Sequence, residues 1–212
     1  MAAKSNLVNM VAVLGLTCLL CSAVLGGAYA LTKDPIDQAA AEKTNRAIAE
    51  VLPHFTDLSF DADKNCYTAT DGGNLVGYAI QSEAVGFGGA LVLLVGVTPD
   101  GVVYNTSVLS HAETPGLGAK CTTDQKFMSQ WKGFNPTVKK LSVKNDGGDV
   151  DAITASTITS RAYTLAVENA LNTFAKVSEE VSSGAFARAG SQSDAEEEAS
   201  SETINEGGLN NE

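Results

Sequence analysis

Hydrophobic residues follow three patterns along the chain. Residues 7–31 are apolar apart from Asn9, Thr17 and Ser22, and residues 66–109 hold short apolar runs separated by glycine-rich turns. Apolar residues recur every three or four positions over 36–52 and again over 163–181. That spacing indicates helices, whereas short apolar runs between turns indicate strands. The pattern predicts an α+β domain in which helices flank a mostly antiparallel sheet, with one transmembrane helix ahead of it.

Turn residues place the strands. Asp71-Gly72-Gly73-Asn74 separates residues 66–70 from residues 75–81, which predicts a hairpin. The continuous apolar run over residues 90–97 is typical of a buried strand. A Pro-Asp-Gly turn leads from it into a further strand over residues 102–109.

The first apolar segment is long enough to cross a membrane. As a helix, residues 7–31 span about 37 Å, against a hydrocarbon core of roughly 30 Å. Lys4 precedes the segment and Asp34 and Asp37 follow it, which predicts a cytoplasmic amino terminus and an extracytoplasmic domain. Ala28-Tyr29-Ala30 also fits a signal-peptide cleavage site. The run is longer than the usual signal sequence, so a retained single-pass anchor in the cytoplasmic membrane is favoured.

A helix is expected between the anchor and the strands. Asp34-Pro35 is typical of an N-cap and first turn, and Pro53 ends the apolar spacing. We therefore divide the chain into an anchor (1–32), an extracytoplasmic domain (33–183) and an acidic extension (184–212).

Charge is concentrated at the carboxyl end. The net charge is −11, and no Lys or Arg follows Arg188. Seven acidic residues lie beyond it: Asp194, Glu196, Glu197, Glu198, Glu202, Glu206 and Glu212. Such a segment is most simply a disordered, solvated extension. Nucleic-acid binding needs clustered basic residues, so no nucleic-acid partner is expected.

The four cysteines fall into two pairs. Cys18 and Cys21 lie inside the apolar segment, where thiols facing lipid or a partner helix are commoner than redox or metal sites. Cys66 and Cys121 belong to the domain, and an oxidising compartment would allow them to pair. The sequence leaves their pairing open.

Hydroxyl residues gather where the last helix is expected to begin. Thr157, Thr159 and Ser160 follow a Gly- and Asp-rich turn and precede the apolar spacing over 163–181. A helix start exposes unpaired backbone N–H groups, which can bind a phosphate. Taken alone, these residues are more simply explained as helix-capping and first-turn residues.

Two glycine-containing loops are further candidates. Residues 111–118, His-Ala-Glu-Thr-Pro-Gly-Leu-Gly, form a loop after a strand. His111 and Glu113 could be a metal or acid–base pair, but no third metal ligand is in view. Gly86-Phe87-Gly88-Gly89 lacks the third glycine of a dinucleotide fingerprint, and no helix pattern follows it, so we interpret it as a flexible turn into a strand.

The hydroxyl-rich region resembles a known motif. Asp151-x-x-Thr154-x-x-Thr157 is similar to the flavinylation motif of the FMN-binding domain family, Asp-x-x-Ser/Thr-Gly-Ala-Thr followed by a hydroxyl pair, here Thr159 and Ser160. In that family the last Thr, here Thr157, is esterified to the ribityl phosphate of FMN. The resemblance therefore implies a covalent FMN on Thr157.

Two positions depart from the family's pattern. Ala155 stands in place of the Gly and Ser156 in place of the Ala. Both are small, which keeps close approach possible. Ala155 would fit poorly if the backbone there needs a positive φ.

The loop over residues 111–118 strengthens the resemblance. It is very similar to the loop that packs beside the flavin ring in the G subunits of Rnf-type complexes. Residues 49–53, Gly77-Tyr78 and Trp131-Lys132-Gly133-Phe134 extend the likeness over residues 7–181. The residues that it assigns to FMN binding are Asp151, Thr154, Ala155, Ser156, Thr157, Thr159, Ser160, His111, Glu113, Thr114, Gly116, Leu117 and Gly118.

The resemblance also implies a function. An Rnf-type G subunit relays electrons through its flavin within a membrane-bound, ion-translocating ferredoxin:NAD oxidoreductase, with no independent catalytic site and no metal. Its partners would be other integral membrane subunits and a magnesium-dependent flavin transferase. The alternatives are the C subunit of the sodium-translocating NADH:quinone reductase, a free-standing flavoprotein feeding an extracellular acceptor, and an anchored binding module without flavin.

Overall fold

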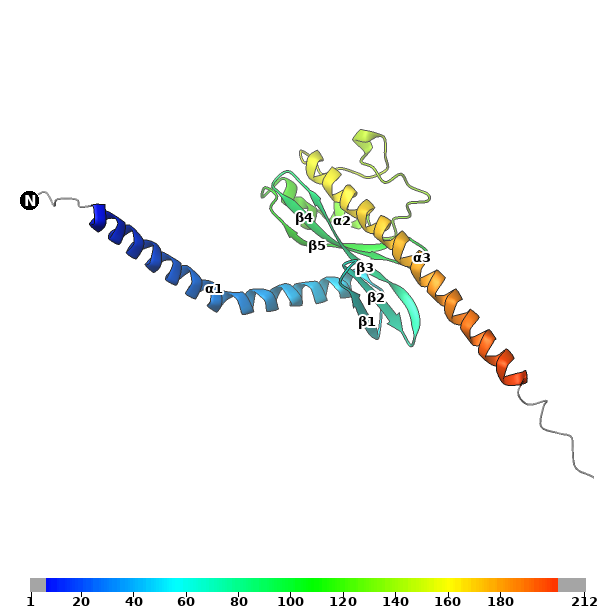
Figure 1. Cartoon of the computed structure of the whole chain (residues 1–212). Coiled ribbons are helices and arrows are strands. Elements are labelled where there is room, and N and C mark those ends of the chain that lie inside the picture. Colours follow the sequence, from blue (N-terminus) through cyan, green and yellow to red (C-terminus); the bar gives the residue numbers. More distant parts are fainter. Residues whose placement is uncertain (1–6, 202–212) are drawn as a thin grey trace, which may run out of the picture. The chain divides into compact units, whose positions relative to one another are not determined.

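The computed structural model describes residues 7–201 (Figure 1). Packing divides the chain into two units, Met1–Arg46 and Ala47–Glu212. The helices are α1 (Leu7–Val51), α2 (Gln125–Ser129) and α3 (Thr157–Ser201), with short 3-10 turns η1 (Gly118–Thr122) and η2 (Lys144–Asp146). The strands are β1 (Asp57–Asp61), β2 (Cys66–Asp71), β3 (Asn74–Val85), β4 (Ala90–Val97) and β5 (Val103–His111).

Helix α1 is continuous through Pro35. The prediction of a separate helix beginning at Asp34 is therefore wrong. Proline presets a helical φ and removes a single N–H donor, so a long helix can continue through it at a local cost. Among residues 7–201, α1 is the one helix long and apolar enough to span a membrane. Its apolar side chains, such as Leu14 and Leu25, are exposed and suited to lipid.

The five strands form one antiparallel sheet in the order β1-β2-β3-β4-β5. The predicted hairpin is confirmed, because Asp71 pairs with Asn74 across the two-glycine turn. The predicted buried strand is confirmed as β4. Strand β1 was not anticipated, because its five residues are all exposed and its sequence carries no buried apolar run. The α+β class holds, with helices on an antiparallel sheet.

Both faces of the sheet are covered, which explains the unbroken apolar run of β4. Leu93 and Val95 belong to a core shared with α3, whereas Leu94 belongs to a second core with Ile48 and Val51 of α1. Successive strand residues point to opposite faces, so a strand buried on both sides is apolar throughout. Figure 1 shows α3 lying along the sheet.

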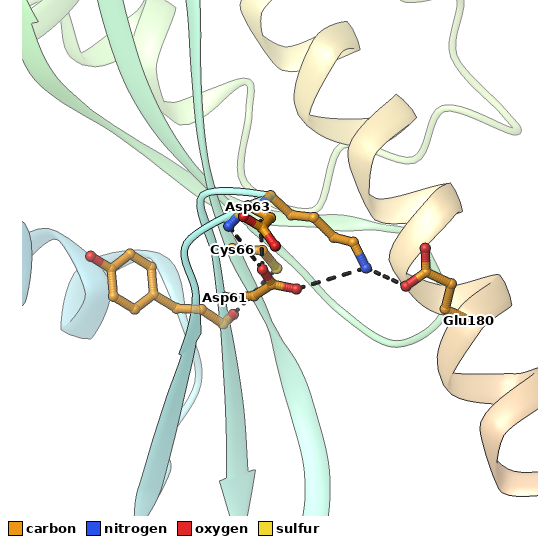
Figure 2. A network of polar contacts seen from close by, with 6 residues as sticks. Asp61, Asp63, Cys66 and Glu180 are labelled. Carbon is orange, nitrogen blue, oxygen red and sulfur yellow. Dashed lines mark hydrogen bonds and ion pairs between the residues drawn. The ribbon is translucent and has the colours of Figure 1, made fainter.

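Polar contacts tie the sheet edge to α3. Lys64, in the turn between β1 and β2, forms an ion pair with Glu180 of α3 and a second one, 3.7 Å long, with Asp61 (Figure 2). The hydrogen bond to Glu180 is the largest of the effects that raise the pKa of Lys64. These are solvent-accessible pairs, which contribute little free energy.

In the part of the chain that the structure describes, helix α3 runs from Thr157 to Ser201. The backbone of residues 184–201, which the sequence assigns to the acidic extension, is helical there. Alanine and glutamate, which make up residues 195–199, are strong helix formers. The rest of the acidic extension, residues 202–212, lies outside the described residues.

Cys66 and Cys121 are both free and fully buried. Burial raises the pKa of each thiol to about 11. The disulfide between Cys66 and Cys121, which the sequence neither predicts nor excludes, is not formed in the structure.

Candidate functional site

The start of α3 carries the hydroxyl residues. Ser156 is the last residue before the helix, and its carbonyl accepts the first helical hydrogen bond, 3.0 Å from Ser160 N. Thr157 is the first helical residue. Its side chain is partly exposed, whereas Ser156 and Thr159 are buried. The chain reaches this helix through Ala155, whose φ is +61°, in the left-handed region.

Ser160 closes the loop onto the helix. Its Oγ accepts a hydrogen bond from Ile153 N at 2.9 Å and donates one to Ser156 O at 3.0 Å. The predicted residue Ser160 therefore shapes the loop and is itself fully buried.

Glu113 connects three segments. Its carboxylate accepts hydrogen bonds from Thr159 Oγ1 of α3 at 2.8 Å and from Gly88 N, in the turn before β4, at 3.3 Å. Its backbone N–H donates to His111 Nδ1 at 3.3 Å. Glu113 is 6% exposed. A buried carboxylate needs such partners, since unpaired burial of a charge is costly.

Two glycines make room for this carboxylate. A Cβ at Gly86 would overlap Glu113 Oε1, and a Cβ at Gly118 would overlap Glu113 Oε2 and approach Thr159 Oγ1 to 2.6 Å. The glycines of these two loops therefore allow close packing around Glu113, which is a structural use that the sequence alone did not reveal.

A cavity of about 390 Å³ opens beside Thr157. Its size lies within the range of roughly 300–1,000 Å³ typical of ligand sites. Phe87, Leu117 and Ile158 supply apolar surface, and each is exposed. The remaining lining residues are Glu113, Thr114, Gly118, Ala155, Ser156, Thr157 and Thr159.

Eight of the thirteen predicted site residues thus line one cavity. The other five are His111, Gly116, Asp151, Thr154 and Ser160. Asp151 instead pairs with Lys144 through a 2.8 Å contact, and this hydrogen bond lowers the pKa of the carboxyl. Gln130 holds the backbone of Asp151 in both directions, accepting from Asp151 N at 2.8 Å and donating to Asp151 O at 3.1 Å.

Phe87 and Ile158 are cavity residues that the sequence interpretation missed. The signal for Phe87 was present, since it is a lone aromatic residue in the Gly86–Gly89 turn. The turn was interpreted only as a connection between strands. Ile158 had no such signal beyond its place next to Thr157.

Comparison with known proteins agrees with the resemblance. Residues 86–172 match the FMN-binding domain family. The chain is 34% identical over 161 residues to the G subunit of the proton-translocating ferredoxin:NAD(+) oxidoreductase complex of Clostridium ljungdahlii, covering 74% of this chain and 86% of that protein. It is 35% identical over 170 residues to the G subunit of the ion-translocating oxidoreductase complex of Haemophilus influenzae, covering 70% and 81%.

The chain belongs to this family of G subunits. A solved structure, that of the C subunit of the Na(+)-translocating NADH-quinone reductase of Parabacteroides distasonis, is also similar, with 25% identity and a TM-score of 0.42. That similarity covers 53% of this chain and 61% of the other.

The residues around the cavity of this G-family protein fit FMN. The first turn of α3 leaves backbone N–H groups without helical partners, as every helix start does. Beside them Ser156 is 7% exposed, and its Oγ has no hydrogen-bond partner in the part of the chain described. A phosphate accepts such donors, and the apolar side chains around the cavity suit a flat aromatic ring.

The left-handed Ala155 yields a stability prediction. Replacing Ala155 with Gly should raise the free energy of unfolding by about 1 kcal/mol, because Gly reaches a positive φ without a Cβ clash. Urea unfolding of the full chain in mild detergent would measure it. Ala152→Gly, at a position without positive φ, should not stabilise. Equal or lower stability of Ala155→Gly would contradict the assigned strain.

The Glu113 contacts yield a second prediction. Glu113→Gln keeps the size and shape of the side chain. Its amide N–H₂ group, however, then faces one of the two hydrogen-bond donors, Gly88 N or Thr159 Oγ1. The substitution should therefore lower the free energy of unfolding by about 1–3 kcal/mol. The same urea titration applies, with Glu83→Gln on β3 as the control. An unfolding midpoint equal to that of the control would rule out a central role for the carboxylate.

Proposed function

We propose that this chain is the flavin-carrying, electron-transferring subunit of a membrane-bound, Rnf-type ferredoxin:NAD oxidoreductase coupled to ion translocation, with FMN bound covalently to Thr157. The proposal is supported most directly by one observation. Thr157 begins α3 beside the cavity, next to a buried Ser156 hydroxyl without a partner among the described residues. The names of the similar G subunits supply the oxidoreductase and the ion coupling.

The attachment needs outside help. A threonine hydroxyl is a weak nucleophile without a base, and no hydrogen bond between Thr157 Oγ1 and a basic side chain is found among the side chains described, residues 8–180. A magnesium-dependent flavin transferase would supply the activation, with FAD as the donor. Thr157 Oγ1 forms a bond to the FMN phosphorus while the bond between that phosphorus and the oxygen of AMP breaks. The hydroxyl proton passes to the released AMP, and no electron is exchanged.

Different residues of the cavity would contact different parts of the cofactor. The first turn of α3 and Ser156 would hold the phosphate, while Leu117 and Ile158 would pack against the ring. Thr114 offers a hydroxyl at the cavity wall. FMN supplies the redox chemistry when bound, and the protein orients it and limits its exposure to water. The chain itself needs no further catalytic group for electron relay.

The proposed membrane arrangement is supported by the length and apolar composition of α1. Its apolar part would cross the cytoplasmic membrane once, with the amino terminus inside and the flavin domain outside. A covalent bond would keep the cofactor in place where free flavin is scarce. Other integral membrane subunits would deliver and accept the electrons.

Removal of the attachment oxygen tests the covalent bond. After coexpression with a flavin transferase, the full chain should gain the mass of one FMN less water, and its denatured band should fluoresce. Thr157→Ala should lose both signals, because no oxygen remains at the acceptor position. Thr154→Ala is the matched control, since Thr154 is exposed and does not line the cavity. Flavin retained in Thr157→Ala, or lost equally in both variants, would refute the assignment.

Assembly is tested by purification. A tagged chain extracted in mild detergent from its native membranes should bring down polytopic membrane subunits and a ferredoxin- or NAD-linked activity, since a relay needs a donor and an acceptor. A tagged chain without residues 1–32 should not co-purify with them. Isolation of the full chain alone, yet loaded with FMN, would instead favour a free-standing flavoprotein.

A further inference from the structure

The turn between β3 and β4 presents an aromatic side chain at the cavity. Phe87 is 69% exposed, although it lines the cavity beside Thr157. The turn is tight, because Gly86 N donates to Gly89 O at 2.8 Å. An exposed phenylalanine contributes little to folding. If a ligand buries the ring, the apolar surface removed from water contributes to binding of that ligand.

The turn is held in place by Glu113. Gly88 N donates to Glu113 Oε1, and the other oxygen of the same carboxylate accepts from Thr159 Oγ1. The backbone beside Phe87 is therefore linked through one side chain to the first turn of α3. The backbone that carries Phe87 therefore has a defined position relative to the first turn of α3.

The cavity is lined by both apolar and polar side chains. Phe87, Leu117 and Ile158 come from three separate segments and supply apolar lining. Ser156 and Thr157 supply polar lining at the helix start. A ligand with a flat aromatic ring system and a phosphate tail suits both kinds of lining.

We propose that Phe87 contacts the isoalloxazine of the bound flavin and covers one side of it against water, with Glu113 as the positioning residue that holds the Gly86–Gly89 turn. This inference rests on the proposed function and adds a residue to it. Phe87 forms no bond to the cofactor, so attachment at Thr157 does not require its ring.

Iodide quenching of flavin fluorescence tests whether Phe87 shields the isoalloxazine from solvent. The full chain is coexpressed with a flavin transferase and purified in detergent, and its intact mass reports loading. In loaded Phe87→Ala the iodide quenching constant should rise roughly twofold or more, because one side of the ring becomes open to solvent. Phe87→Leu keeps an apolar side chain but lacks the aromatic ring, so its iodide quenching constant should rise less.

A matched control and the loading measurement separate the possible failures. Phe60→Ala removes another exposed phenylalanine, on β1, and should leave the constant unchanged. An unchanged constant in loaded Phe87→Ala would overturn the inference, as would loss of loading in both Phe87 variants while the wild type loads. Absence of flavin from the wild type would instead overturn the proposed function.

Discussion

A buried carboxylate links the segments that line the cavity beside Thr157. Glu113 accepts hydrogen bonds from the turn before β4 and from the first turn of α3, and Gly86 and Gly118 leave room for it. These segments are separated from one another along the sequence. Since a buried carboxyl group needs hydrogen-bond partners, a displacement of either donor segment leaves Glu113 with a lost partner. The relative position of the two segments thus depends in part on the Glu113 side chain, while Ser160 holds the loop before α3.

Much of the fold could be predicted from local pattern. The two-glycine turn indicated the β2–β3 hairpin, and the apolar run of β4 reflected burial on both faces. Strand β1 could not be predicted, since it is exposed and exists through pairing with β2. The continuation of α1 through Pro35 was also missed, because proline is as typical of a helix start as it is tolerable inside a long helix.

The site was only partly predictable. Motif spacing placed Thr157 at a helix start, and the structure puts it there. Asp151 was assigned to the cofactor by the same motif, but its carboxylate pairs with Lys144 instead. Lys144 lies outside the motif, so the motif does not encode this contact. Phe87 was a lone aromatic residue in a glycine-rich turn, but only the folded sheet brings that turn beside α3.

The two buried thiols have a consequence for a redox protein. Cys66 and Cys121 sit in the apolar core, where burial raises the pKa of each and keeps it protonated. A thiol in that state is a poor nucleophile and a poor reductant. The domain can therefore mature in either an oxidising or a reducing compartment without a disulfide catalyst. These two thiols would not compete for electrons that pass through the domain.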